Sequence, residues 1–401
     1  MPVKQAYQEF LDETIKNLHQ GQRLDVQTIL CQVFESLMES ERAVFLNESL
    51  DNKGNGFYSR FINHLQGRFE IKIPRDRRGQ FYPLTLEIIK QDSVRMDQLA
   101  LSLYSQGVSH RGVSHIFKDL FSCHYSPGKL SQLVKAFEPL RLSWQQRLLS
   151  SHYHVILIDA LYHAVRRDNV AQEATYIVMG LKQDYSREIL GLYHLPRESA
   201  EGWKQVFQDL KQRGLQQVGL VLCDELSGIE AALEQHLPHC AIQCCLVHKV
   251  RRLIAHVRHQ DKAHLIADWH EVLDLDNPFH TPEQFQLHLT KFIDQWGKRY
   301  PSIRGSLPEY KWRYYHQYLN YPVQLRRMLY TTNWIERFNK EVRKTTQHVN
   351  SFPNPDAALN LIFMIIKQME EKTYRIPITS FYPFKQHMEK ILFGLPQTQN
   401  Y

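Results

Sequence analysis

Apolar residues follow one another without a break from Val155 to Ile158, and the run then meets a carboxylate, Asp159. A continuous apolar run of this kind is typical of a strand that is buried on both faces. An unpaired charge inside such a strand is costly, so Asp159 needs a cation, a hydrogen-bond donor or water beside it. Two interpretations stay open at this point: Asp159 accepts backbone hydrogen bonds where the strand ends, or it binds a metal ion.

Strands and helices alternate on the carboxyl side of this run. The pattern predicts, in order, strands over 154–162, 175–181 and 188–195, a helix over 199–213, a strand over 218–223 that ends at Asp224, a helix over 228–237, a short strand over 241–247 and a helix from His248. Short connections make the first three strands antiparallel, whereas helical crossovers add parallel strands. The order predicts an α/β fold with a mixed five-stranded sheet and helices on both faces, as in a ribonuclease-H-like core.

Helical periodicity dominates the other regions and suggests the domain organisation. Three short helices joined by tight turns are typical of a helix-turn-helix module, although three-helix units are also common packing modules. Long apolar stripes at helical spacing predict an all-helical insertion within the core. We expect an N-terminal helical and basic region over 1–92, with a helix over 4–47 and a strand over 69–73, and then a helix-turn-helix-like DNA-binding region over 93–150. The core is expected over 151–251 and 331–375, with the insertion over 252–330 between its two parts. A C-terminal tail over 376–401 follows, and it is expected to be loose from Pro396.

Composition and charge restrict the class of protein. The chain has 401 residues, of which 43% are hydrophobic, and this length suits one large domain or about two to three ordinary ones. The 49 Lys and Arg against 42 Asp and Glu give a net charge of +7, which permits a polyanionic partner without requiring one. The six Cys are not spaced as a disulfide framework, and neither an apolar signal segment nor a membrane-spanning run is present. We therefore expect a soluble cytoplasmic protein with reduced thiols.

Basic residues occur in two places where they could contact DNA. Arg75, Arg77 and Arg78 lie on a predicted turn and could hold phosphates, although the segment by itself favours a solvated loop. In the three-helix region, Arg111 and Lys129 could face DNA if the module is a helix-turn-helix.

A strongly amphipathic helix is predicted over 331–347. Its polar stripe carries Glu336, Asn339, Lys340 and Arg343 at helical spacing. A glutamate beside amide and basic groups suits a site for a metal ion and phosphates. The alternative is a surface ion pair between Glu336 and Lys340 at the i,i+4 spacing.

Three carboxylates would meet in the predicted sheet. Asp159 lies on the first, central strand, and Asp224 lies at the carboxyl end of the strand expected beside it. The helix that follows the insertion could bring Glu336 to the same side, and we expect Asp159 within metal-bridging reach of Asp224. Oxygen-rich sites suit Mg²⁺ or Mn²⁺. Two such ions, about 3.5–4 Å apart, can hold the attacking and leaving oxygens of a phosphodiester.

The motifs in this order resemble those of a known family. They are Pro74-Arg-Asp-Arg-x-Gly-x-Phe81, Leu103-Tyr-x-x-Gly107 with Ser109-x-Arg111, Ser126-Pro127, Ile158-Asp-Ala160 with Tyr162, Asp224 with Gly228, Gln243-x-Cys-x-x-His-x-x-Arg251 and Thr332-Asn-x-Ile-Glu-x-x-Asn-x-x-x-Arg343. From about Glu39 to about residue 370 the chain resembles bacterial insertion-sequence transposases of the Mutator superfamily.

The resemblance implies a DDE transposase with a ribonuclease-H-like core and a helical insertion. Asp159, Asp224 and Glu336 would be the catalytic, metal-binding triad, with Mg²⁺ or Mn²⁺ as cofactor. The enzyme would cleave at terminal inverted repeats and transfer a 3′-hydroxyl into target DNA at the bacterial nucleoid. Because two ends must be brought together, a homo-oligomer on double-stranded DNA is implied. Cys245 and His248 match the family's Cys-x-x-His element.

His248 is expected to shape the active site and to contact DNA. A zinc site is the weaker interpretation, because no second paired ligand is evident at a suitable spacing.

Several residues depart from the family pattern. Cys244 replaces a basic residue, Arg252 stands where Asn is common, Gly54 stands where Arg is usual, and Glu225 follows Asp224 where Gly is commoner. None of these changes removes a carboxylate. Two alternatives therefore remain: a catalytically decayed DNA-binding protein, or another nuclease with a ribonuclease-H-like core. A phosphate-binding loop, a zincin motif and a Gly-x-Ser-x-Gly motif are all absent.

Overall fold

The computed structural model describes residues 12, 15–16, 26–49, 51–64, 67–121, 125–166, 168–195, 199–347 and 349–394. The first half of the helix expected over 4–47 and the tail from Pro396 lie outside these residues. The chain divides into two compact units, residues 1–136 and 137–401. The sequence pattern placed the boundary at residue 150 instead, and α6 (Glu138–Gln145) belongs to the second unit because Arg141 binds Asp356 and Asn360 there.

The first unit combines a β-hairpin with helices. Its core packs α2 and α3 against the hairpin through Met38, Ile62, Ile71, Ile73, Leu86 and Ile89. The elements are α2 (Val26–Glu48), β1 (Gly54–His64), β2 (Gly67–Asp76), α3 (Leu84–Ser105), α4 (His110–Phe121) and α5 (Pro127–Lys135). Three helices are present where three short ones were expected, but the first of them, α3, has 22 residues and begins before residue 93. Ser126 caps α5 by accepting a hydrogen bond from the Lys129 amide at 3.1 Å.

The hairpin corrects the expectation for this unit, because only 69–73 was predicted as a strand and β1 was missed. Aromatic side chains on β1 point to solvent, so its apolar residues do not alternate as a half-buried strand would. Arginines cover these rings instead: the Arg42 guanidinium lies 4.7 Å from the Phe57 ring centre and that of Arg68 lies 4.4 Å from Phe61. Pro74 is tolerated inside β2 because its partner Phe57 borders a register shift.

Asp76 organises the turn that carries the predicted phosphate-binding arginines. Its carboxylate accepts hydrogen bonds from the Asn52 side chain at 2.7 Å and from the amides of Arg78, Gln80 and Phe81 at 3.0–3.2 Å. Burial alone would raise the pKa of Asp76, but these hydrogen bonds lower it below its ordinary value. Arg77 and Arg78 are exposed on this turn, and Arg75 is exposed at the end of β2.

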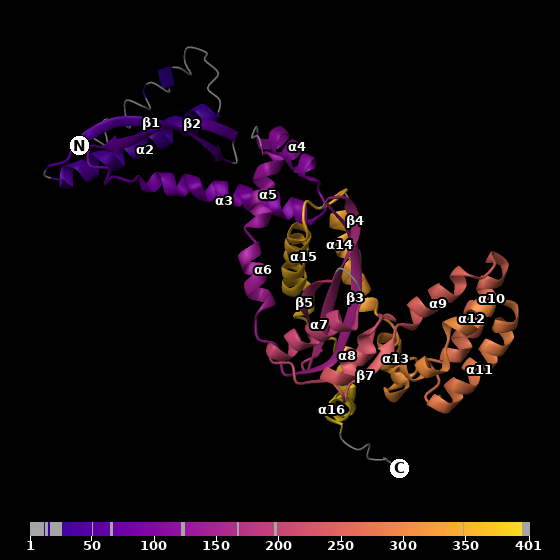
Figure 1. Ribbon diagram of the computed structural model, residues 1–401. Helices are drawn as coiled ribbons and strands as arrows, with labels where there is room; N and C mark the ends of the chain where they lie inside the picture. Colours follow the sequence, from indigo (N-terminus) through magenta and orange to yellow (C-terminus); the bar gives the residue numbers. More distant parts are fainter. Residues whose placement is uncertain are drawn as a thin grey trace. The chain divides into compact units, whose positions relative to one another are not determined.

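The second unit is built on the predicted mixed five-stranded sheet, in the order β5-β4-β3-β6-β7. The strands are β3 (His152–Arg166), β4 (Val170–Lys182), β5 (Arg187–Leu195), β6 (Gln217–Cys223) and β7 (Ala241–Cys244). The pairs of β3 with β4 and of β4 with β5 are antiparallel, whereas those of β3 with β6 and of β6 with β7 are parallel. Figure 1 shows the long strands β3 and β4 side by side.

Helices cover both faces of the sheet. Trp203 of α7 packs on Tyr176 of β4, with 4.8 Å between ring centres. Asn339 of α14 contacts Asp159, which lies on the opposite face because neighbouring strand residues alternate. The helices and turns around the sheet are α7 (Ala200–Gln212), α8 (Ile229–His236), α9 (Leu246–Ala255), α14 (Asn333–Thr346), α15 (Pro355–Met369), η3 (Glu370–Tyr374), η4 (Thr379–Phe384) and α16 (Lys385–Phe393).

The C-terminal segment is a second correction, because 376–401 was expected only as a tail. Helix α16 packs against β6 and β3, and the Gln217 side chain donates a hydrogen bond to the Leu392 carbonyl. Gly219 makes this approach possible, since a Cβ there would lie 2.8 Å from the His154 carbonyl oxygen and 3.6 Å from the Leu392 Cα.

The insertion between α9 and α14 is helical, as predicted. It consists of α10 (His259–Leu273), α11 (Pro282–Arg299), α12 (Pro301–Ser306), η1 (Glu309–Tyr314), η2 (Gln317–Asn320) and α13 (Val323–Leu329). Figure 1 shows α10, α11 and α12 grouped together. Trp269 and Phe292 from the two predicted apolar stripes meet at 5.3 Å. None of the described helices combines the length and apolar character that a membrane span requires.

The Asp76 hydrogen bonds predict an acid-sensitive contribution to stability. In the folded state the pKa of Asp76 lies below its unfolded value of about 3.9, so the contribution is complete above about pH 4 and is lost as the pH falls through the folded pKa. Asp76→Asn should therefore lower the thermal unfolding midpoint at neutral pH, and the difference from wild type should shrink in acid. Asp51→Asn, which changes an exposed carboxylate, is the control. A difference that does not vary with pH would contradict this assignment.

Candidate active site

The parallel pairing of β3 with β6 positions two carboxylates. The last register pair is Ile158 with Cys223, so Asp159 and Asp224 each follow directly where the pairing of β3 with β6 ends. Asp159 continues β3, whereas Asp224 begins the turn that leads to α8. The register alone therefore brings together two residues that are far apart in the sequence.

Asp159 is a buried carboxylate, with 8% of its surface exposed. One oxygen accepts a hydrogen bond from the Ala160 amide at 2.9 Å, and the other accepts one from the Asn339 side chain at 2.7 Å. Burial raises the pKa of Asp159 to about 6; the charge of His248 opposes this shift and that of Asp224 adds to it. Within the described residues, no Lys, Arg or His lies within ion-pair distance of Asp159. Its partners are neutral donors, so its charge is incompletely compensated.

His248 connects the other two carboxylates. Its Nδ1 lies 3.0 Å from Asp224 Oδ1, and its Nε2 lies 3.6 Å from Glu336 Oε1. Contacts with Asp224 and with Cys245 raise the pKa of His248 to about 10, so the ring is a cation at neutral pH. The imidazolium thus neutralises part of the negative charge between Asp224 and Glu336.

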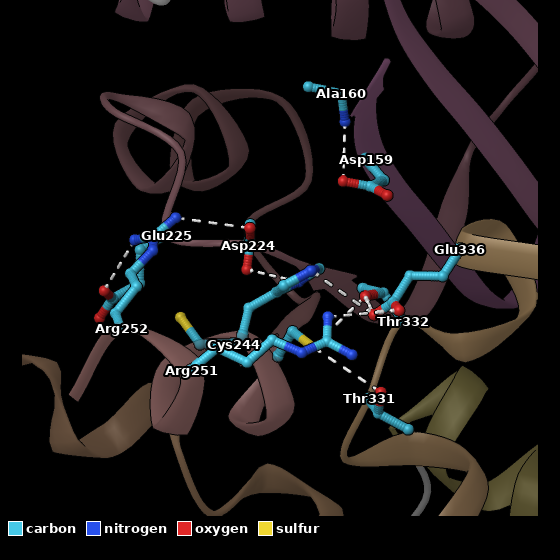
Figure 2. A network of polar contacts seen from close by, with 12 residues as sticks. Asp159, Ala160, Asp224, Glu225, Cys244, Arg251, Arg252, Thr331, Thr332 and Glu336 are labelled. Carbon is cyan, nitrogen blue, oxygen red and sulfur yellow. Dashed lines mark hydrogen bonds and ion pairs between the residues drawn. The ribbon is translucent and has the colours of Figure 1, made fainter. Parts of the chain in front are cut away.

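Arginines and a threonine complete this network. Figure 2 shows that Asp159, Asp224 and Glu336 project from three different parts of the fold. Arg252 lies 3.4 Å from Asp224, and Arg251 lies 3.5 Å from Glu336. Thr332 donates to Glu336 at 3.2 Å from the residue before α14. The surface ion pair of Glu336 with Lys340, considered from the sequence, does not form, because Glu336 faces α9.

The exposed and buried residues of α14 have different tasks. Asn339 was expected to contact DNA, and this expectation is wrong: the residue is 0% exposed and its side-chain amide donates a hydrogen bond to Asp159. Lys340 and Arg343 lie on the exposed side of the same helix, where they remain accessible.

A second set of potential metal ligands overlaps this network. In the described part of the chain, three potential ligands lie close together: Asp224, Cys245 and His248. Their donor atoms all lie within 4.8 Å of one another. Sulfur and imidazole donors suit zinc rather than Mg²⁺. The Cys245 sulfur lies 3.3 Å from the Thr332 hydroxyl oxygen, and contacts with His248 and Thr332 lower the pKa of Cys245 although burial opposes this.

The three carboxylates offer a donor set for a hard divalent ion. All their ligand atoms are oxygens, they come from β3, the turn after β6 and α14, and the buried Asp159 lacks a cationic partner. The chemistry of these donors suits such an ion. Their donor atoms are not all within 4.8 Å of one another, because His248 lies between Asp224 and Glu336.

Comparison with known proteins identifies the family. Residues 4–375 match the sequence model described as "Transposase, Mutator family". The chain belongs to the Mutator family of transposases. It is 31% identical over 332 residues to the transposase for insertion sequence element IS1201 of Lactobacillus helveticus, covering 81% of this chain and 89% of that protein. It is 30% identical over 355 residues to the transposase for IS256 in transposon Tn4001 of Staphylococcus aureus, covering 86% and 90%.

The remaining predicted site residues of this Mutator-family chain lie in the first unit. Arg111 is exposed on α4, Arg78 lies 3.9 Å from Asp51, and Lys129 forms an ion pair with Asp97 at 3.1 Å. Sequence reasoning assigned no role to Thr332, Arg251 or Glu225. Arg251 and Thr332 stand in the quoted motifs, but only the fold reveals that they surround Glu336.

The Asn339 contact predicts a stability effect. Asn339→Ala removes the donor from one oxygen of the buried Asp159 carboxylate, while the Ala160 amide still binds the other, and should lower the free energy of unfolding by about 1–3 kcal/mol. Lys340→Ala on the exposed side of the helix should change it by less than about 0.5 kcal/mol. Chemical denaturation measures both variants, and equal effects would contradict the role of Asn339.

Proposed function

We propose that this transposase is a metal-dependent DDE enzyme with a ribonuclease-H-like core. It would cleave DNA at terminal inverted repeats and join the freed 3′-hydroxyl to target DNA. The observation that carries the proposal is the position of Asp159 and Asp224, each directly after the last paired residues of the neighbouring parallel strands β3 and β6, with Glu336 linked to Asp224 through His248. The strand order, with three antiparallel strands followed by two parallel additions, supports the assignment of the core.

Asp159, Asp224 and Glu336 would hold Mg²⁺ or Mn²⁺. The bound ions supply Lewis-acid activation of water or a 3′-hydroxyl and stabilise the leaving oxygen. The chain contributes the position of the carboxylates: Asn339 and the Ala160 amide orient Asp159, and Thr332 orients Glu336. No side chain needs to act as the nucleophile.

Basic groups beside the triad suit the phosphates of the reacting strand. Arg251 is 56% exposed while it contacts Glu336, so its guanidinium can also face a bound backbone. Lys340 and Arg343 are exposed on the helix that carries Glu336. His248 would stay close to the reacting phosphodiester through its contacts with Asp224 and Glu336. Since transfer joins two element ends to a target, we propose that the active form is a homo-oligomer on double-stranded DNA.

Recognition of DNA is proposed for the first unit. Between Lys53 and Arg78 the chain has seven Lys or Arg and two Asp or Glu. The net charge of this segment is therefore +5, and that of the whole chain is +7. One of the two acids, Asp76, is buried in the turn and does not offset the surface charge. Arg75, Arg77 and Arg78 would contact phosphates, and Arg111 and Lys129 would do so from α4 and α5.

Substitution of the triad tests the catalytic proposal. Asp159→Asn, Asp224→Asn and Glu336→Gln should each remove several kcal/mol of transition-state stabilisation, which is about 100-fold or more in the rate of Mg²⁺-dependent cleavage. Binding of end-containing DNA should persist. Glu341→Gln, on the same helix as Glu336 but paired with Lys344, is the control. Undiminished cleavage by Asp159→Asn would exclude the mechanism, and binding without any cleavage by wild type would favour a decayed DNA-binding protein.

The charge of the turn after β2 predicts a salt effect. Arg77→Ala should weaken DNA binding to a similar extent for different sequences, and should reduce the slope of log affinity against log salt by about 1. Lys90→Ala removes a base whose charge is already paired with Glu87 and should leave the slope unchanged. Fluorescence anisotropy over a range of salt concentrations measures both slopes, and identical slopes for the two variants would rule out a phosphate contact by Arg77.

A further inference from the structure

A second ion pair lies directly beside the contact of Asp224 with His248. Lys249 Nζ lies 2.7 Å from Glu225 Oε1. Both pairs join the turn after β6 to the first turns of α9. The acids Asp224 and Glu225 are adjacent in the turn, and the bases His248 and Lys249 are adjacent in the helix. Arg252, one turn further along α9, reaches both acids, at 3.4 Å from Asp224 and 3.3 Å from Glu225. The turn and the helix are therefore connected twice, once through the proposed site and once beside it.

The second pair joins a buried lysine to a largely buried glutamate, and both have additional partners. The exposed fraction is 3% for the Lys249 side chain and 14% for that of Glu225. Glu225 Oε1 also accepts a hydrogen bond from the Tyr315 hydroxyl at 2.6 Å. Lys249 donates to the Ser306 carbonyl and lies 5.1 Å from the centre of the Tyr315 ring. A buried charge pair is favourable only when such additional partners satisfy it.

The insertion supplies these additional partners. Ser306 ends α12 and Tyr315 follows η1, so both belong to the segment between α9 and α14. Gln243 of β7 fixes the same segment to the sheet: its amide donates to the Tyr315 carbonyl at 3.2 Å and accepts from the Tyr318 amide at 3.0 Å. The position of Tyr315 is thus determined by both the insertion and the edge of the sheet.

We propose that Glu225 and Lys249 are positioning residues for the Asp224 carboxylate and His248, and that Tyr315 makes this positioning depend on the helical insertion. The proposal rests on the proposed function, because it assigns Asp224 to the metal-binding triad. It also gives a role to Glu225 and to the insertion, neither of which touches the reacting groups.

The physical need for this support lies in the turn itself. Asp224 is outside the strand, and a hydrogen bond from the Leu226 amide to the Asp224 carbonyl is a local contact that leaves the direction of the side chain open. A site for metal ions requires its ligands within about 0.5 Å of the productive geometry. An anchor one residue away, on both the turn and the helix, restricts the two backbones from which Asp224 and His248 project.

Neutral variants of the pair test the proposal in the full-length chain. Glu225→Gln and Lys249→Met should each reduce the rate of Mn²⁺-dependent cleavage by about 10- to 100-fold and raise the Mn²⁺ concentration needed for half-maximal rate. DNA affinity should stay within about twofold, because neither residue is placed on the DNA-binding surface. Tyr315→Phe should act in the same direction with a smaller effect. Glu234→Gln, which breaks an exposed pair between α8 and Arg313 of the insertion, should behave as wild type.

The double variant Glu225→Gln/Lys249→Met separates positioning from stability. Replacing both partners leaves no unpaired buried charge, so the thermal unfolding midpoint should recover towards wild type. The cleavage rate and the Mn²⁺ dependence should remain impaired. A double variant that recovers the rate together with the midpoint would show a purely structural pair and overturn the proposal, as would single variants that cleave like wild type at the same Mn²⁺ concentration.

Two further experiments distinguish failure of the positioning proposal from failure of the proposed function. Asp159→Asn in the same assay tests the triad alone, and its full activity would exclude the mechanism whatever Glu225 does. Hydrogen exchange of the metal-free protein tests the positioning without catalysis. Residues 224–228 and 246–253 should exchange faster in Glu225→Gln than in wild type, with β3 and β4 unchanged. Unaltered exchange in both segments would overturn the proposal even if wild type proved inactive.

Discussion

The burial of Asp159 in the central strand is the constraint on which the candidate site depends. A carboxylate with 8% exposure must obtain its partners from the fold, and its side-chain donor, Asn339, lies 180 residues away in the sequence. That contact fixes α14 against β3 and thereby sets the position of Glu336 on the same helix. Helix α14 therefore has two tasks, because its buried side stabilises Asp159 and its first turn presents Glu336 to His248.

Charge compensation links the parts of the site. The imidazolium of His248 and the guanidinium groups of Arg251 and Arg252 offset Asp224 and Glu336, whereas Asp159 receives neutral donors alone within the described residues. The burial of Asp159 and the charge of Asp224 both raise the pKa of Asp159. A divalent cation near Asp159 and Asp224 would relieve both effects, and this supports the proposed site for metal ions.

The sequence was most informative where the pattern is local. Continuous apolar runs predicted the strands of the mixed sheet, because burial on both faces leaves a clear signature, and apolar stripes at helical spacing predicted the helical insertion. Strand β1 gave no such signature, since Phe57 and Phe61 are exposed and covered by arginines. The roles of Asn339 and Glu225 depend on contacts with Asp159 and Tyr315, which are distant in the sequence and could not be inferred from spacing.

The position of a bound metal ion tests the central claim most directly. Anomalous scattering from crystals of the full-length chain grown with Mn²⁺ would locate the ion without reference to activity. We expect a peak whose ligands include carboxylate oxygens of both Asp159 and Asp224. A peak held by Asp224, Cys245 and His248 without Asp159, or no peak at this end of the sheet, would contradict it.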